Sequence, residues 1–397
     1  MMNRETDKKF LFVTPFLGEV DRILSACSQR GFRQPDDSGG GGSKLRSISQ
    51  LIKAGENIAT THELFSRFSD DMIKVIEEVG YTLVLDEVIE TLEIVDLNVT
   101  NSYYYRFDDT LLDGKLVNVG NSQYVWSFSP SLFKGFKEAY VLTYMFSGQT
   151  MKSFFEINGI PYELIGVRLE GGEYAFCPIG EMPRARDYIN RIHVLENDKL
   201  NSIGNKRSSF SATNVKSRGR SSEELIEKTQ KNLRNVFINI FKSRQRDTMW
   251  SSYKEIADKI VPHGYKGSFV PFNQRASNKY ADRHYLAYCA NVFLHPAEAH
   301  YYSSRGAPVD TDMYALSVLI QWVFRSAIRK GEDVWIYIPS GRMRYLFKEW
   351  LRNIESGDDL KTITYKSGAE RMAEKTKPAR RGRPKKRGRK KSTSNKK

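Results

Sequence analysis

Two adjacent carboxylates close a short apolar run in the first quarter of the chain. Residues 81–88 read YTLVLDEV, and the run ends on Asp86 and Glu87. In nucleotide-driven motors a buried strand delivers one carboxylate to Mg²⁺ and a second to the attacking water. The pattern therefore predicts that Asp86 holds Mg²⁺ through water and that Glu87 is the general base of ATP hydrolysis. The alternative is a strand end that merely faces solvent.

A second candidate group lies more than 200 residues later, in the segment from 312 to 329. At about 100° per residue, Gln321, Arg325 and Arg329 share one face of a predicted helix, and the opposite face is apolar. Arginines on one domain can reach phosphates held by another domain. These three residues are therefore candidate catalytic residues, and the alternative is a solvated face of an ordinary amphipathic helix.

No G-x-x-x-x-G-K-[ST] phosphate loop occurs in the sequence. The glycine-rich string SGGGGSK, residues 38–44, has the wrong order, because Lys44 is followed by Leu45 and the preceding residues are not a strand. We interpret it as a connecting loop.

Short apolar runs alternate with amphipathic stretches, which predicts an α/β fold with mainly parallel sheets. Strands are expected at 10–13, 57–60, 81–85, 139–144 and 334–338, and helices at 17–26, 48–54, 64–79, 223–241 and 343–354. The predicted domains are 1–150, then 151–355 with a flexible Ser- and Gly-rich insertion at about 202–222, then a disordered tail at 356–397.

Composition narrows the class of protein. The three cysteines are far apart and form no pair at metal-ligand spacing, which fits a reducing cytoplasm, that of the host cell if the gene belongs to a phage. No apolar stretch is long enough to span a membrane. Of the net charge of +15, residues 366–397 carry +13, so the rest of the chain is nearly neutral. This distribution indicates a globular protein with a polyanion-binding arm.

The basic tail contains RRGRPKK at residues 380–386. Its centre, Arg381, Gly382, Arg383 and Pro384, resembles an AT-hook, an extended element whose arginines enter the narrow minor groove of A·T-rich DNA. The alternative is a generic basic tail that binds any polyanion.

Taken in order, the motifs resemble the superfamily 2 helicases, in particular a divergent phage group of DEAD/DEAH type. The strings that carry the resemblance span residues 10 to 352: FLFVTPFLGEVDRI (10–23), NIATTHELF (57–65), LVLDEV (83–88), VLTYMFSG (141–148), FNQRASNKYADR (272–283), LIQWVFRSAIR (319–329) and IYIPSGRMRYLFKEWL (336–351).

The resemblance implies two RecA-like domains, ATP with Mg²⁺ bound between them, and single-stranded DNA across their tops. It assigns DNA contacts to the first two strings and a sensing role to the fifth, with the candidates Thr14, Pro15, Thr60, Thr61, His62, Asn273, Arg275 and Asn278. Thr143 would couple the two domains.

The chain departs from this pattern at its start, because the Walker A strand and loop should precede Phe10 and only nine polar residues stand there. A separate polypeptide could carry the loop, the start codon could be misassigned, or the motor could have decayed. Two functions follow. The first is an ATP-dependent DNA helicase, or the larger part of a split one. The alternative is a non-catalytic DNA-binding relic whose affinity comes from the tail.

Overall fold

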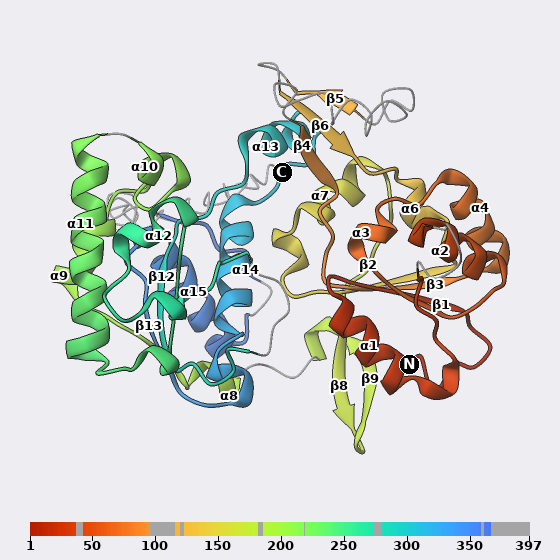
Figure 1. Ribbon diagram of the computed structural model, residues 1–397, viewed down its shortest axis with the longest axis horizontal. Helices are drawn as coiled ribbons and strands as arrows, with labels where there is room; N and C mark the ends of the chain where they lie inside the picture. Colours follow the sequence, from red (N-terminus) through yellow and green to blue (C-terminus); the bar gives the residue numbers. More distant parts are fainter. Residues whose placement is uncertain are drawn as a thin grey trace, which may run out of the picture. The chain divides into compact units, whose positions relative to one another are not determined.

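The computed structural model describes residues 1–36, 43–95, 116–119, 123–181, 186–217, 219–273, 279–358 and 361–366. Met1–Thr364 form one compact unit, and Tyr365–Lys397 form another, of which two residues are described. The first unit is built around two four-stranded parallel sheets (Figure 1). The predicted α/β class with mainly parallel sheets is confirmed.

The first sheet has the strand order β2-β1-β3-β7, with every neighbouring pair parallel. Its strands are β1 (Phe10–Thr14), β2 (Ile58–Thr61), β3 (Thr82–Asp86) and β7 (Glu138–Leu142). The central strands β1 and β3 are mostly apolar and buried along almost their whole length, because helices cover both faces of the sheet. The edge strand β7 is only partly covered.

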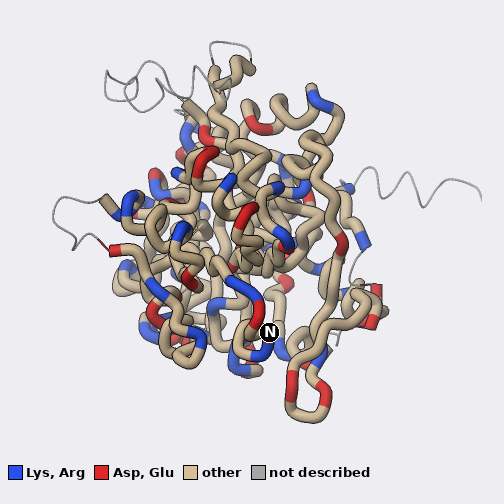
Figure 2. The backbone as a smooth tube through the Cα atoms, turned by 90° about the vertical axis from the view of Figure 1, so that its right-hand side faces the viewer, with Lys and Arg blue, Asp and Glu red and all other residues tan. Residues whose placement is uncertain are grey.

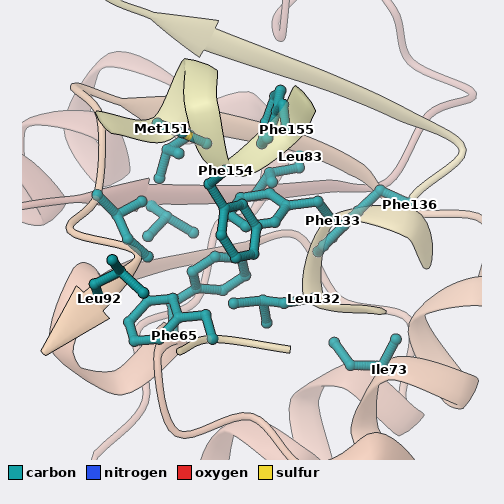
Figure 3. Close-up of a cluster of buried hydrophobic side chains, with 14 of the residues drawn as sticks. Phe65, Ile73, Leu83, Leu92, Leu132, Phe133, Phe136, Met151, Phe154 and Phe155 are labelled. Carbon is teal, nitrogen blue, oxygen red and sulfur yellow. The ribbon is translucent and has the colours of Figure 1, made fainter. Parts of the chain in front are cut away.

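The larger core lies on one face of this sheet. It gathers Leu83 of β3, Phe65, Phe133 and Phe154, whose aromatic rings pack edge to face in part (Figure 3). The other face packs against the helix that follows β1, through residues such as Phe12 and Val20. The helices of this half are α1 (Leu17–Ala26), α2 (Lys44–Lys53), α3 (His62–Phe65), α4 (Asp70–Val79), α6 (Ser131–Lys134) and α7 (Thr150–Ile157), with the 3₁₀ turns η1 (Ser28–Arg30) and η2 (Phe146–Gly148).

The second sheet has the order β10-β13-β12-β11, again parallel throughout. Its strands are β10 (Ile192–Val194), β11 (Thr248–Ser252), β12 (Tyr285–Cys289) and β13 (Val334–Tyr337). The helices of this half are α8 (Arg186–Ile189), α9 (Asp198–Asn201), α10 (Ala212–Lys216), α11 (Arg220–Asn235), α12 (Lys254–Ile260), α13 (Pro296–Ser303), α14 (Thr311–Val323) and α15 (Gly341–Ser356). Short turns complete it: η3 (Ile179–Glu181), η4 (Ser202–Gly204), the π-helical η5 (Val236–Ile240), η6 (Gln245–Asp247), η7 (Lys266–Ser268) and η8 (Ala327–Lys330).

Two small antiparallel sheets accompany the parallel ones. One has the order β4-β6-β5, from β4 (Leu92–Val95), β5 (Leu116–Asn118) and β6 (Tyr124–Ser127). The other is a hairpin of β8 (Ile165–Glu170) and β9 (Glu173–Pro178). Its tip carries acidic residues on both sides, visible at the lower right of Figure 2.

Two predicted helices are wrong in extent. The helix expected from 64 to 79 is broken into α3 and α4, because the Ser69 hydroxyl accepts a hydrogen bond from Met72 N and starts a new helix. The helix expected from 312 to 329 ends at Val323, and the chain continues through Ser326 into η8.

The expected flexible insertion at 202–222 is also wrong. Apart from Arg218, which lies outside the described residues, the segment consists of η4, a stretch of turns, α10 and the start of α11. Phe210 is fully buried in the second core. The buried amide of Asn291 donates hydrogen bonds to the carbonyl oxygens of Arg207 and Ser209. These contacts hold the segment in place although its composition is typical of a loop.

The boundary predicted at residue 150 does not match the packing. Helix α7 begins at Thr150, yet Met151 and Phe154 lie in the first core. Helix α13 also packs there, through Ala297 and Tyr302, although the strands before and after it belong to the second sheet.

Candidate functional site

Polar side chains converge at one edge of the first sheet, where its strands end. The Thr14 hydroxyl, at the end of β1, donates to a carboxylate oxygen of Asp86, at the end of β3, over 3.2 Å. His62, which follows β2, has its Nε2 2.9 Å from the Asp86 carbonyl oxygen. The backbone N–H of Glu87 donates to the Leu142 carbonyl oxygen of β7 over 3.0 Å. Carboxyl ends of parallel strands meet at one edge, and ligands of open α/β sheets bind there.

The backbone at this edge is strained at two places. Glu87 and Met145 adopt left-handed conformations, with φ of 64° and 57°. Such φ values are uncommon for residues other than glycine, and they cluster at functional sites where the surrounding structure enforces them. Glu87 directly follows β3, and Met145 lies three residues after β7. The strain therefore falls at the ends of neighbouring strands.

Several opposing effects shift the pKa of the Asp86 carboxyl group. Burial raises its pKa, and the hydrogen bond from Thr14 opposes that shift. The charge of Glu19 raises the pKa further, and that of Arg22 lowers it. Both of these residues belong to α1 and form an ion pair with each other. A cation beside Asp86 would relieve the cost of its ionised form.

The donor set fits one half of a magnesium–nucleotide site. A partly buried carboxylate and a neighbouring hydroxyl supply oxygen ligands, which Mg²⁺ prefers. Mg²⁺ usually keeps several waters and therefore needs few protein ligands. The residues do not supply the half that holds the phosphates, because the chain has no phosphate loop. The described residues also contain no group of three or more His, Cys, Asp or Glu that could hold a metal ion.

The residues expected to contact DNA near this edge differ in exposure. Thr14 and Thr60 are buried, and their contact with DNA stays a prediction. Pro15, Thr61 and His62 are half-buried. The Thr61 hydroxyl caps α3 by accepting from Leu64 N.

Thr143, the predicted coupling residue, is half-buried and follows β7 directly. Two residues later the backbone turns at Met145 into η2, which packs against α14. A Cβ atom on Gly148 would lie 2.6 Å from the backbone of Met313, so only glycine permits this approach. The position of Thr143 between the carboxylate edge and α14 suits a coupling role, which stays a prediction.

The three candidate catalytic residues of the second half do not form the predicted stripe. Gln321 is half-buried, Arg325 is buried with its Nε donating to the Gln321 carbonyl oxygen, and Arg329 is exposed. Arg329 and Lys330 line a shallow surface hollow with Lys279 and Asp282. This hollow lies beside the amino ends of β12 and β13, whereas η2 contacts the first turn of α14, about 20 Å away along the helix. Their catalytic roles stay predictions.

Other predicted DNA contacts lie partly outside the described residues. Asn273 is exposed. Arg275, Asn278 and the AT-hook-like residues 381–384 fall outside the described ranges. Over the described part, Lys and Arg alternate with Asp and Glu without a dominant sign, as Figure 2 shows. This mixture agrees with the small net charge of residues 1–365.

The sequence did not reveal residues whose roles depend on contacts between distant parts of the chain. Glu19 and Arg22 lie one turn apart on α1, and only the fold shows that they influence Asp86. Sequence reasoning also missed Arg342, a fully buried guanidinium paired with Asp312. A basic residue inside an otherwise apolar helical face was the available signal.

Comparison with known proteins establishes the family. The SPbeta prophage-derived protein YonV of Bacillus subtilis strain 168 is 31% identical over 392 residues, which cover 89% of this chain and 94% of YonV. The chain belongs to the YonV family. Residues 186–351 match the YonV C-terminal Rossmann-like domain, which contains the second sheet from β10 to β13.

Among solved structures, S. tokodaii Xpd4 is 12% identical, with 89% of this chain and 90% of that chain covered and a TM-score of 0.42. A likeness at this level carries no argument about activity. Within the described ranges of this YonV-family chain, no helix is long and apolar enough to cross a membrane.

Proposed function

We propose that this YonV-family protein is a phage-type ATP-dependent DNA helicase, or the larger part of a split one, that couples ATP hydrolysis to movement on DNA. The observation that carries the proposal is the meeting of Thr14, His62, Asp86 and Glu87 at the carboxyl edge of a parallel sheet. An edge of this kind is the usual ligand site of such folds.

Each residue of the edge has a role that its contacts support. Asp86 would hold Mg²⁺ through water, and the Thr14 hydroxyl fixes the orientation of its carboxylate. Glu87, which directly follows β3 and has a left-handed backbone, accepts a proton from the attacking water. His62 holds the Asp86 backbone in place. Bound Mg²⁺ would neutralise charge on the transferred phosphate.

The proposal includes a partner for the phosphates. Because this chain has no phosphate loop, we propose that a separate polypeptide supplies one, with single-stranded DNA bound over the motor domains and A·T-rich duplex bound by the tail. We place the protein in the cytoplasm of the host cell, where DNA and ATP are available.

The test is DNA-stimulated ATPase activity of the full chain mixed with a fragment that carries a strand followed by a Gly-Lys-Thr phosphate loop. We expect Glu87→Gln to lower the activity at least about 100-fold, which is a typical loss for a general base. Glu77→Gln, an exposed change on α4, is the matched control and should leave the activity unchanged. Equal activity of the Glu87→Gln variant and the unaltered chain rejects the proposal, as does no activity in either.

A second candidate function is a non-catalytic DNA-binding protein in which the motor fold is a scaffold. The missing phosphate loop favours it, since backbone amides and a lysine normally hold the phosphates. In that case the isolated chain should not bind ATP in equilibrium dialysis, with or without Mg²⁺. Measurable ATP affinity contradicts this second function.

Both functions assign the tail to DNA. Deletion of residues 366–397 should weaken binding and flatten its salt dependence, because each phosphate contact releases counterions. Replacing Arg383 should reduce any preference for A·T-rich duplex more than replacing Lys396. An unchanged salt slope after the deletion shows that the tail is not the binding arm.

A further inference from the structure

One segment between two elements of the second half of the fold packs against the first core. After β12, residues 294–310, here called the strap, cross to the first core and then continue into α14. Within the strap, α13 packs against β4, β6 and α7, and Figure 1 shows it beside β4 and β6. Ala297, Tyr301 and Tyr302 are buried there. The strap is therefore a part of the first core that is covalently joined to the second sheet.

The strap is bound to the segment that follows the carboxylates. The hydroxyls of Tyr302 and Thr91 lie 2.9 Å apart, and both residues are fully buried. Thr91 comes only five residues after Asp86, and its carbonyl oxygen accepts from Phe128 N over 3.1 Å. Next to this bond, the charge of Glu90 acts on Glu298 of α13. Besides its direct contacts with Thr14, His62 and Leu142, the Asp86–Glu87 segment is therefore joined to α13 through Thr91.

At its other end the strap defines the start of α14. Asp310 caps this helix by accepting hydrogen bonds from Asp312 N and Met313 N, each over 3.0 Å. Met313 is also the residue against which Gly148 packs. Two connections therefore leave the carboxylate edge, one after β3 through the strap and one after β7 through η2. Both reach the first turn of α14.

We propose that the strap is the coupling element of this protein, and that the Thr91–Tyr302 bond links the Asp86–Glu87 segment to the first turn of α14. The link itself is independent of any ligand. Its use in transmitting ligand binding rests on the proposed function.

The test is hydrogen exchange of the full chain without ligand. Tyr302→Phe should accelerate exchange about tenfold in three places: residues 86–95, α13, and the first turn of α14. Thr91→Val, which removes the same bond from the other side, should give the same pattern and serves if Tyr302→Phe fails to fold. Tyr174→Phe, in the exposed hairpin strand β9, is the control and should change none of these segments. Acceleration confined to α13 in both variants overturns the proposal.

A second experiment tests the coupling role of the strap separately from the proposed function. In the unaltered chain, Mg²⁺ and ADP, added with the phosphate-loop fragment, should slow hydrogen exchange at residues 86–91 and at the first turn of α14. In Thr91→Val the protection should remain at 86–91 and be lost at α14. If no segment is protected in either chain, the proposed nucleotide site is wrong, and the ligand-free exchange alone decides the strap. Equal protection of α14 in both chains overturns the coupling role.

Discussion

The carboxyl edges of the two parallel sheets are built from similar elements but differ in the charged side chain that each one buries. At the first edge, Asp86 is partly buried, and burial raises its pKa. At the second, just beyond β12, the Arg342 guanidinium is fully buried with every nitrogen engaged. It donates to Asp312 and Asn291 side-chain oxygens and to the carbonyl oxygens of Thr311 and Val292, over 2.7 to 2.9 Å.

The difference separates a structural edge from a candidate ligand edge. A buried charge is tolerated when a partner and several hydrogen bonds satisfy it, which is the case for Arg342. At Asp86, burial raises the pKa and so disfavours the ionised form, which a neighbouring cation would stabilise. The left-handed backbones of Glu87 and Met145 occur at the first edge. Of the two edges, the first is therefore the candidate ligand edge.

The largest expected effect tests whether the second edge is structural. Arg342→Leu leaves the Asp312 carboxylate buried without its partner and should lower the free energy of unfolding by about 3–5 kcal/mol. Urea denaturation measures it. Arg352→Ala, at an exposed pair on the same helix α15, should cost less than about 0.5 kcal/mol. A similar small loss for both would remove the contrast between the edges.

A smaller effect concerns the contact that joins the first edge to α14. Gly148→Ala places a Cβ 2.6 Å from the Met313 backbone and should cost about 1–3 kcal/mol through overpacking. Gly18→Ala, where no atom lies within 4 Å, should be neutral or slightly stabilising. Thermal unfolding of the two variants compares them directly. Equal melting temperatures would mean that η2 and α14 separate freely.

Glu298 makes the strap sensitive to pH. Burial, followed by the charge of Glu90, raises its pKa from 4.5 to about 7, against a small opposing effect of the His295 backbone, and Tyr302 also faces it. A raised carboxyl pKa stabilises the fold at low pH, and this stability is lost as pH rises from about 4.5 to about 7. Glu298→Gln should flatten this part of the stability curve by about 1 kcal/mol, allowing for partial exposure. An unchanged slope, or the same flattening in the exposed control Glu77→Gln, contradicts the assignment.

The smallest effect sharpens the description of the first edge. Since the pKa of Asp86 is raised, its contribution to stability falls as pH rises through that pKa. Asp86→Asn should therefore slightly raise the melting temperature at pH 7 relative to the unaltered chain, with a smaller difference at pH 4. Asp71→Asn, at an exposed position of α4, should show no such pattern. A loss of stability at pH 7 would make Asp86 a structural residue like Asp312.

Local patterns were enough for several elements. The helix α1 was predicted with its observed ends, and β1 and β3 were predicted to within one residue, because an amphipathic period or an apolar run defines each one. The prediction of one helix at 64–79 was wrong, because the helix breaks at the Ser69 cap. The apolar spacing continues across this break, so the periodicity alone did not reveal it.

The sequence by itself determined where the two carboxylates lie along the chain: the string LVLDEV places Asp86 and Glu87 at the end of a buried strand. Only the tertiary structure decided which partners they meet. The Thr14–Asp86 bond joins residues 72 positions apart, and the Thr91–Tyr302 bond joins residues 211 apart. The burial of Arg342 depends equally on distant segments. Periodicity is set by neighbours along the chain, whereas burial, pKa and hydrogen-bond partners are set by the segments that fold against them.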